Sequence, residues 1–342
     1  MVKTNAGRFF EDYAPGQVIE HAVPRTVSGG ERAMYHALYP ARGALYSSDE
    51  FARSCGLPAS PLDDLAGFHV VFGKSVPDIS LNAVANLGYA EGRFLKPVYA
   101  GDTLRSSSEV IGVKQNSNGK TGVVYVRTRG TNQRGETVME FVRWVMVRKR
   151  DVEADAPETV VPELSKVVAA EDLPIPEGLD FSSYDFTQAG EEHRWGDYEI
   201  GEQIDHVDGV TIEEAEHMMA TRLWQNTAKV HFDATARPDG TRLIYGGHVI
   251  SMARALSFNG LANAQMIVAI NGGAHANPCL SGDTVRAWSE VLDKAETSAP
   301  GVGAVRLRLV ATKGEAFKLR GDDGKYLPEV LLDLDYWALM PL

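Results

Sequence analysis

The segment WQNTAKVH, residues 224–231, brings an amide, an ammonium group and an imidazole together: Asn226, Lys229 and His231. A free imidazole has a pKa near ~6.5, so His231 could take up and return a proton at neutral pH. Asn226 cannot act as a base at neutral pH, but its amide can donate to and accept from a water molecule. This pattern favours proton transfer to and from an oriented water. The structural alternative is a loop histidine that only bonds to the backbone.

The region around this segment occurs twice, because the chain is a diverged tandem repeat. The segment RFFEDYAPGQVIEHAVPRTVS near the start corresponds to HRWGDYEIGEQIDHVDGVTIEE, which begins at His193. Five identical pairs share an offset of 185 residues: Asp12/Asp197, Tyr13/Tyr198, Gly16/Gly201, Ile19/Ile204 and His21/His206. Residues 94–110, FLKPVYAGDTLRSSSEV, match residues 276–291 at an offset of 181, and Trp144 corresponds to Trp337 in the last strands. The matches follow one order in both halves, which indicates two copies of one unit.

The boundary between the copies is predicted in residues 151–185, which are acidic, contain prolines and show weak periodicity, as linkers do. We therefore predict an N-terminal domain over 1–150 and a C-terminal domain over 186–342. At an offset of 185, Tyr46 corresponds to His231 and Ala41 to Asn226. The first copy has lost both polar groups, so we expect one competent site and one degenerate site. A tandem can use the space of the second half to hold a substrate, whereas a symmetric homodimer must duplicate its site.

Each half shows the same order of predicted elements: an early helix, a loop, one long apolar helix and several strands. The long helices are expected at 62–76 and 246–262, and each is apolar on most sides, which favours a helix wrapped by a sheet. Alternating or apolar runs predict strands at 121–130, 136–147 and 304–312, and an Asp-Gly pair predicts a hairpin within 315–327. The order indicates an α+β fold.

The bulk properties exclude several classes of protein. A net charge of −12 argues against a nucleic-acid partner, because phosphate binding needs a basic face. Cys55 and Cys279 lie in no metal-like spacing, and no apolar run reaches the ~18 residues that a membrane span needs. We expect a cytoplasmic protein without a membrane segment or a metal.

The loop before the second long helix, the GDTL-type strand start and the strand sequences together resemble the hot-dog fold of MaoC-like (R)-specific enoyl-CoA hydratases, here in tandem as a double hot-dog. The stretches SLNAVANLGYAEGRFLKPVYAGDTL, NSNGKTGVVYVRTRG and FVRWVMVRKRD are most similar to the mesaconyl-CoA hydratase (β-methylmalyl-CoA dehydratase) branch. The resemblance implies a lyase that adds water to a short, branched enoyl thioester carrying a free carboxylate. It implies no cofactor and no metal, since CoA is part of the substrate, and we expect a homo-oligomer.

The family loop has the pattern D-x-N-P-[LIV]-H, so the resemblance places the family's histidine at His231, its aspartate at Asn226 and its proline at Lys229. Because Asn226 replaces a carboxylate, either His231 performs both proton transfers or a second acid assists. Candidates for that acid lie in or near the two long helices: Asp63, Asp64, His69 and His248. For Asp63 and Asp64 the alternative is stabilisation of a helix N-terminus.

The start of the second long helix, Tyr245-Gly246-Gly247, is the candidate oxyanion site, because backbone N–H groups at a helix N-terminus point toward negative charge. Lys229 or Arg222 could contact the free carboxylate of the substrate. Lys114, Lys120 and Arg286 could bind the CoA phosphates, and the sequence does not choose among them.

Three functions remain open at this point. They are a hydratase, of mesaconyl-CoA or of another short enoyl-CoA, a hot-dog thioesterase, and an acyl-thioester binding module without catalysis, because one fold supports all three. A thioesterase would more often use a carboxylate on the central helix, for which Asp64 is available. Retention of His231 in one copy argues against a binding module.

Overall fold

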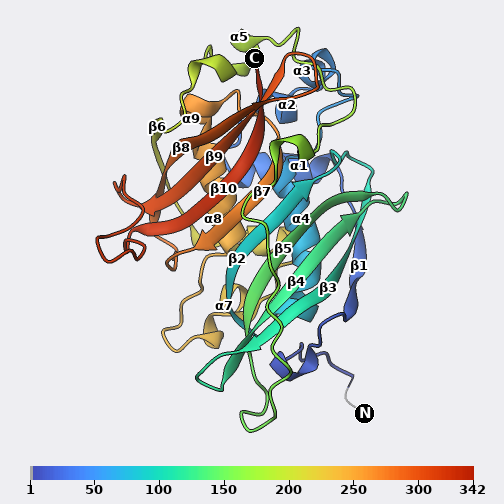
Figure 1. Ribbon diagram of the computed structural model, residues 1–342, viewed down its shortest axis with the longest axis vertical. Coiled ribbons are helices and arrows are strands. Elements are labelled where there is room, and N and C mark those ends of the chain that lie inside the picture. The colour runs from blue at the N-terminus through green and yellow to red at the C-terminus, as the bar shows by residue number, and fades with distance from the viewer. Residues whose placement is uncertain (1–2) are drawn as a thin grey trace.

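The computed structural model describes residues 3–342, and its largest element is one antiparallel sheet of ten strands (Figure 1). The strand order is β1-β3-β4-β5-β2-β7-β10-β9-β8-β6. Residues 18–148 supply β1 (Val18–Thr26), β2 (Ala83–Phe94), β3 (Thr103–Gln115), β4 (Thr121–Thr131) and β5 (Thr137–Arg148). Residues 203–341 supply β6 (Gln203–Thr211), β7 (Ile267–His275), β8 (Thr284–Glu296), β9 (Val302–Lys313) and β10 (Val330–Pro341). The two sets of strands join where β2 pairs with β7, with Tyr89 opposite Gly273.

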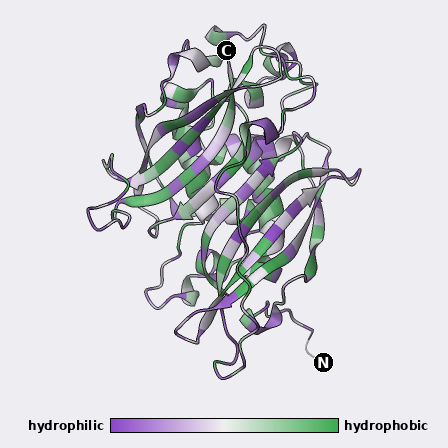
Figure 2. Cartoon of the chain, in the orientation of Figure 1, coloured by the Kyte–Doolittle hydropathy of each residue, from purple (hydrophilic) through white to green (hydrophobic). Residues whose placement is uncertain are grey.

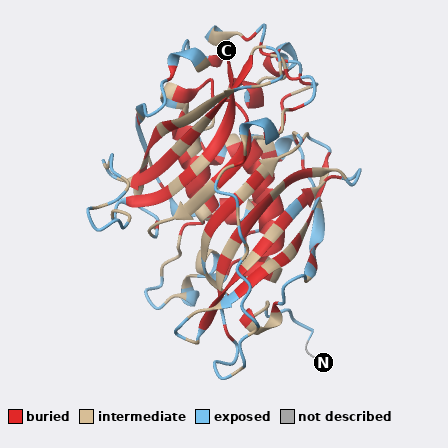
Figure 3. Ribbon diagram, in the orientation of Figure 1, coloured by how far each residue is buried: buried red, intermediate tan, exposed pale blue. Residues whose placement is uncertain are grey.

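One long helix packs against each set of strands. Helix α4 (Asp64–Ser75) contacts β1, β3 and β4, and α8 (Gly246–Leu256) contacts β6, β8, β9 and β10. Every residue of α4 is buried, and Figure 3 shows buried positions along both central helices and the strands in front of them. Along the strands, hydrophobic and hydrophilic residues alternate (Figure 2), as expected where one face of a sheet covers a core. The arrangement confirms the predicted α+β double hot-dog fold.

The remaining helices lie in the connections. They are α1 (Gly29–Leu38), α2 (Ala44–Ser47), α3 (Asp49–Ser54), α5 (Phe186–Ala189), α6 (Glu214–Leu223), α7 (Lys229–Phe232) and α9 (Phe258–Leu261). Short 3₁₀ turns occur at η1 (Phe10–Asp12), η3 (Ala170–Asp172), η4 (Trp195–Asp197) and η5 (Ala234–Ala236), and η2 (Val76–Ser80) is a π-helical turn after α4. The early helix of each half is therefore present, as α1 and α6.

The second long helix is shorter than predicted. The sequence predicts a helix over 246–262, but α8 ends at Leu256 and the chain leaves helical geometry at Asn259 and Gly260, which has φ +92°. Asn259 accepts a hydrogen bond from Nδ1 of His206 at 2.7 Å and donates one to the His206 carbonyl at 3.2 Å. These bonds fix the break, because they hold the backbone of Asn259 against strand β6 and glycine tolerates the left-handed conformation that follows.

The predicted strands are found as β4, β5 and β9, with their ends shifted by at most two residues. The Asp-Gly hairpin is a small turn, closed by the bond from the Gly321 N–H to the Lys325 carbonyl at 3.0 Å and a single bridge between Arg320 and Tyr326. No named strand forms in this hairpin, so the prediction is right for the turn alone.

Residues that repeat between the halves make the same bonds twice. Nε2 of His21 lies 2.8 Å from the Ser108 hydroxyl, and Nε2 of His206 lies 2.8 Å from the Ser289 hydroxyl. Each pair ties the first strand of its half to the neighbouring long strand. The recurrence of these histidines therefore has a structural cause.

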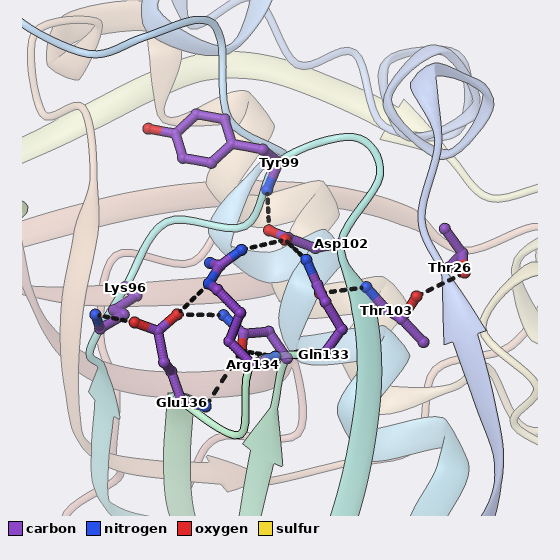
Figure 4. A network of polar contacts seen from close by, with 9 residues as sticks. Thr26, Lys96, Tyr99, Asp102, Thr103, Gln133, Arg134 and Glu136 are labelled. Carbon is purple, nitrogen blue, oxygen red and sulfur yellow. Dashed lines mark hydrogen bonds and ion pairs between the residues drawn. The ribbon is translucent and has the colours of Figure 1, made fainter.

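The GDT element is also structural. Asp102 accepts a hydrogen bond from the Tyr99 N–H at 2.9 Å and one from the Gln133 side chain at 2.8 Å, and it anchors the polar network drawn in Figure 4. In the second half, Asp283 accepts from the Leu280 N–H at 2.8 Å in the same way. The aspartate closes the turn before a long strand in both copies.

The connection between the halves packs on the sheet for part of its length. Val160 pairs with Val113 of β3, and the Val168 carbonyl accepts a hydrogen bond from Nε1 of Trp337 at 3.1 Å. The domain limits proposed above stay a prediction, because one sheet runs through both halves. Among residues 3–342, no helix combines the length and the apolar character needed to cross a bilayer.

Candidate active site

A cavity of about 250 Å³ lies where the two halves meet, and both halves line it. The first half contributes Phe72 of α4, Ser80 of η2 and Arg143 of β5. It also contributes Asn86 and Tyr89, which both lie on β2. The second half contributes Asn226, His231, Tyr245, Gly246, His275 and Cys279. The cavity therefore combines the polar loop of one copy with the helix and strands of the other, as the tandem arrangement predicted.

His231 is held by a short helix and one strong hydrogen bond. It is the third residue of α7, and its Nδ1 lies 2.8 Å from the carbonyl oxygen of Leu243. A carbonyl only accepts, so Nδ1 carries the hydrogen and Nε2 is the basic atom. Nε2 has no partner among the described residues, and burial lowers the pKa of His231. The side chain is thus a neutral base on the wall of the cavity.

The first copy holds Tyr46 where the second holds His231. Helix α2 begins at residue 44 and α7 at 229, so both side chains occupy the third position of a four-residue helix. The Tyr46 hydroxyl bonds to the carboxyl group of Asp64. The register predicted from the sequence is confirmed, and the first copy has an internal hydrogen bond in place of a base.

Asn226 lines the same cavity and is 1% exposed. Its Oδ1 accepts a hydrogen bond from the Ala228 N–H at 3.3 Å, which fixes the orientation of the amide. Nδ2 has no acceptor among the described residues. Asn226 can therefore donate a hydrogen bond to a small ligand beside His231.

The N-terminus of α8 supplies backbone donors. Tyr245 is the N-cap, and the N–H groups of Gly246 and Gly247 have no acceptor among residues 3–342. Gly246 lines the cavity and Gly247 does not. A Cβ on Gly246 would lie 2.4 Å from the His275 ring, so any side chain there would displace either the ring or the start of α8. The structure brings two of these three residues, Tyr245 and Gly246, to the cavity.

Tyr245 is positioned from behind by polar groups of both halves. Its hydroxyl lies 3.2 Å from Nδ1 of His69, and Nε2 of His69 lies 2.7 Å from the Ser251 hydroxyl. Burial lowers the pKa of His69 to about 3, so it stays neutral at pH 7. His69 does not line the cavity and supports the Tyr245 ring instead.

The candidate accessory acids lie elsewhere. Asp63 caps α4 by accepting from the Leu65 N–H at 2.9 Å, which is the structural role considered above. Asp64 accepts from the Ile267 N–H at 2.8 Å and bonds to Tyr46. His248 is buried against Tyr39. None of Asp63, Asp64 or His248 lines the cavity of His231.

The two cations that were candidates for binding the substrate carboxylate also lie outside the cavity. Lys229 and Arg222 are both exposed, and neither lines the cavity, although they flank His231 and Asn226 in the sequence. In a helix of one turn, Lys229 and His231 point in different directions. The three candidates for the CoA phosphates, Lys114, Lys120 and Arg286, are likewise absent from the lining.

His275 is a cavity residue that the sequence interpretation missed. It ends β7, and its Nε2 lies 3.2 Å from the Tyr89 hydroxyl. Burial, with a smaller contribution from His231, lowers the pKa of His275 to about 4. At an offset of 181, His275 corresponds to Phe94, so the comparison that singled out His231 could have found it.

Arg143 was missed as well, although its position carries a signal. In β5 the core-facing positions are Phe141, Arg143, Val145 and Val147, so one arginine interrupts an apolar series. Asn86 of β2 carries no comparable signal. Among residues 3–342, no three His, Cys, Asp or Glu side chains gather in a way that could hold a metal ion.

Comparison with known proteins agrees with this geometry. A family model described as mesaconyl-CoA hydratase matches residues 2–318. The chain is 77% identical over 342 residues to a protein named mesaconyl-CoA hydratase from Cereibacter sphaeroides, covering 99% of this chain and 100% of that one. It is 57% identical to a beta-methylmalyl-CoA dehydratase from Chloroflexus aurantiacus, covering 99% of this chain and 98% of that one.

Solved structures show the same architecture. A structure titled putative MaoC domain protein dehydratase, from Chloroflexus aurantiacus, has a TM-score of 0.97 at 57% identity and covers 100% of this chain and 99% of that one. A Mycobacterium tuberculosis protein described as a double hotdog fold has a TM-score of 0.78 at 24% identity, with 98% of each chain covered, and supports the fold alone. Fold and relatives together define the class of this protein as a MaoC-like hydro-lyase. Within that class, the chain belongs to the mesaconyl-CoA hydratase family.

Proposed function

We propose that this chain catalyses the reversible hydration of mesaconyl-CoA to β-methylmalyl-CoA. The observation that carries the proposal is the unpaired Nε2 of His231 in a cavity that the N-terminus of α8 also lines. The names of the relatives at 77% and 57% identity support the substrate. The cavity of about 250 Å³ suits a short acyl group, and the rest of CoA would extend from it.

In the first step, a water molecule is held between Nε2 of His231 and Nδ2 of Asn226. His231 takes a proton from this water while the oxygen of the water bonds to the β-carbon of the enoyl thioester. The electron pair of the double bond moves toward the α-carbon and the thioester oxygen. Because His231 is neutral and faces the cavity, it is ready to accept this proton.

The negative charge that develops on the thioester oxygen needs a donor. The free N–H of Gly246 at the start of α8 can provide one, with the helix dipole behind it. Removing one donor of this kind typically lowers kcat by about 10²–10³-fold.

In the second step, protonated His231 returns the proton to the α-carbon, and the enolate becomes the saturated thioester. One base suffices, since the proton taken from water is the proton that is given back. Dehydration follows the same path in reverse. No carboxylate in the cavity is required, in agreement with a lining that contains no Asp or Glu among the described residues.

The geometry does not favour hydrolysis of the thioester. The helix carboxylate that a thioesterase would use, Asp64, is bonded to Tyr46 and to the Ile267 N–H, away from His231. A binding module would not need an unpaired base beside a helix N-terminus.

The test is a spectrophotometric assay of the purified protein with mesaconyl-CoA, followed by mass analysis of the acyl-CoA. Loss of the enoyl-thioester absorbance with a gain of one water supports the proposal. Release of free CoA would establish a thioesterase instead. Binding of mesaconyl-CoA without any reaction would leave the binding module or another enoyl-CoA as substrate.

A further inference from the structure

The cavity contains a cation that no protein group neutralises. Arg143 is 0% exposed, and no Asp or Glu within the described residues forms an ion pair with it. Its Nη1 donates to the Ser80 hydroxyl at 3.0 Å and its Nη2 donates to the Ser75 hydroxyl at 2.7 Å. The guanidinium also lies over the Phe72 ring, 4.2 Å from the centroid.

These contacts leave Arg143 incompletely paired. A guanidinium has five N–H groups, and the two serine hydroxyls accept from two of them. Nε is buried without a partner. Burying a charge without an opposite charge is costly, so such groups usually pair with a carboxylate or a ligand. Burial lowers the pKa of Arg143 only to about 10, so the cation persists at neutral pH.

The other half has a half-buried arginine in a different setting. Arg254 occupies in α8 the place that Phe72 occupies in α4, at the offset of 182 that relates the two helix starts. Arg254 and Asp63 line the same small cavity of the degenerate copy. Arg254 also donates to the carbonyl of Gln265 at 3.1 Å. A carboxyl group therefore shares the cavity that Arg254 lines, whereas no Asp or Glu among the described residues lines the cavity of Arg143.

A second unpaired group lies on the strand next to Arg143. Both polar atoms of the Asn86 side chain are buried without a partner, and Asn86 lines the cavity. Strands β2 and β5 pair side by side, with Tyr89 opposite Arg143 and Asn86 opposite Val145. The first half thus presents an unpaired cation and an unpaired amide to a cavity in which the second half presents the base.

We propose that Arg143 binds the free carboxylate of the substrate and so selects acyl groups that end in a carboxylate, with Asn86 as an additional donor. This inference rests on the proposed function and names the residue that sets its substrate class. In mesaconyl-CoA the free carboxylate is attached to the β-carbon, which is the carbon that receives water. Arg143 therefore also positions that carbon relative to His231, from the opposite half of the chain. It replaces Lys229 and Arg222, which the sequence suggested for this role and which are exposed.

The test compares mesaconyl-CoA with tiglyl-CoA, in which a methyl group replaces the carboxylate at the same carbon. Truncating one partner of a buried charge pair costs ~2–5 kcal/mol, so Arg143→Gln should lower kcat/KM for mesaconyl-CoA by about 30-fold or more. The kcat/KM for tiglyl-CoA should change by less than about threefold, within the scatter expected when no pairing is lost. Equal losses on the two substrates would overturn the inference.

Two further variants keep the test decisive. Arg143→Lys retains a charge without the planar fork, so it should recover part of the lost selectivity. Arg254→Gln removes a half-buried guanidinium outside the cavity, and it should leave the ratio of the two kcat/KM values unchanged even if the protein becomes less stable. Loss of selectivity in Arg254→Gln would show that any buried cation has this effect and would contradict the assignment.

A binding measurement separates this inference from the proposed reaction. Methylsuccinyl-CoA and 2-methylbutyryl-CoA are saturated, cannot be hydrated, and differ by a carboxylate in place of a methyl group. Titration calorimetry should show tighter binding of methylsuccinyl-CoA to the unmodified protein and loss of that preference in Arg143→Gln. If mesaconyl-CoA is not hydrated but the preference is present, the proposed function fails and the assignment of Arg143 stands. If hydration occurs and no preference is found, Arg143 does not bind the carboxylate.

Discussion

Nδ1 of His231 donates a hydrogen bond to the carbonyl of Leu243 at 2.8 Å, and this contact determines which ring nitrogen is basic. The backbone closes the same pair of segments a second time, because the Leu243 N–H donates to the Val230 carbonyl at 2.9 Å. The loop before α8 and the helix α7 are therefore held together by two bonds. As a result, Nε2 lines the cavity with its lone pair free, in the tautomer that the proposed hydration needs.

Replacing His231 with glutamine should lower kcat for hydration by about 10²–10⁴-fold, because an amide retains polarity but cannot take a proton from water. The matched control is Tyr46→Phe, which alters the corresponding position of the degenerate copy. That variant should keep its kcat and lose some thermal stability, since it removes the bond to Asp64. Steady-state kinetics and thermal melting measure both effects. A His231→Gln enzyme with more than a tenth of the original kcat would exclude His231 as the base.

The pH dependence follows from the same side chain. Burial lowers the pKa of His231 below its ordinary value, so the neutral form dominates at pH 7. The kcat/KM for mesaconyl-CoA should be constant near neutral pH and fall with decreasing pH below about 6.5. Burial also lowers the pKa of His217 to about 3 and that of His275 to about 4, so neither should contribute above pH 5. A profile from pH 5 to pH 9 tests this, and an acidic limb centred above pH 7 would contradict it.

Gly246 should not tolerate a side chain. A Cβ at this position would lie 2.4 Å from the His275 ring, so Gly246→Ala must displace either the start of α8 or the imidazole. Because the proposed oxyanion donor, the Gly246 N–H, shifts with it, we expect kcat to fall by about 10²-fold or more. Gly29→Ala is the control, since Gly29 also begins a helix and has open space around it. Circular dichroism should be unchanged in both variants, and a Gly246→Ala enzyme with unaltered kcat would remove Gly246 from the mechanism.

The repeat made much of this site predictable from the sequence. Because the copies share one register, the difference between Tyr46 and His231 could be recognised before the structure, and the two short helices show that the register is correct. The central helices and the strands β4, β5 and β9 were predictable for a related reason, since their apolar periodicity directly reflects burial. The break at Asn259 was not predictable, because bonds to His206, 53 residues away, create it.

The cations show where sequence proximity misleads. Lys229 lies two residues from His231, but in a single helical turn it points to solvent, whereas Arg143 reaches the cavity from a strand of the other half. Which strand lies beside which loop depends on the joining of β2 and β7, and no local pattern encodes that pairing. Arg143 could be recognised as unusual in an apolar strand, but its place in the cavity could not.

Asn226→Asp would restore the residue that MaoC-like loops usually carry, yet it should impair this enzyme. Asn226 is 1% exposed, and a carboxylate there would stabilise the protonated form of His231 and raise its pKa. The acidic limb of the kcat/KM–pH profile should therefore shift to higher pH. The new charge would also compete with the substrate carboxylate for Arg143 in the same cavity, so KM for mesaconyl-CoA should rise more than KM for tiglyl-CoA.

Asn226→Ala is the matched comparison. It removes the hydrogen-bond donor to water without adding charge, so kcat should fall while the acidic limb of the pH profile stays in place. If Asn226→Asp instead raised kcat with an unchanged limb, a second carboxylate base would improve the reaction, and catalysis by His231 alone would be wrong.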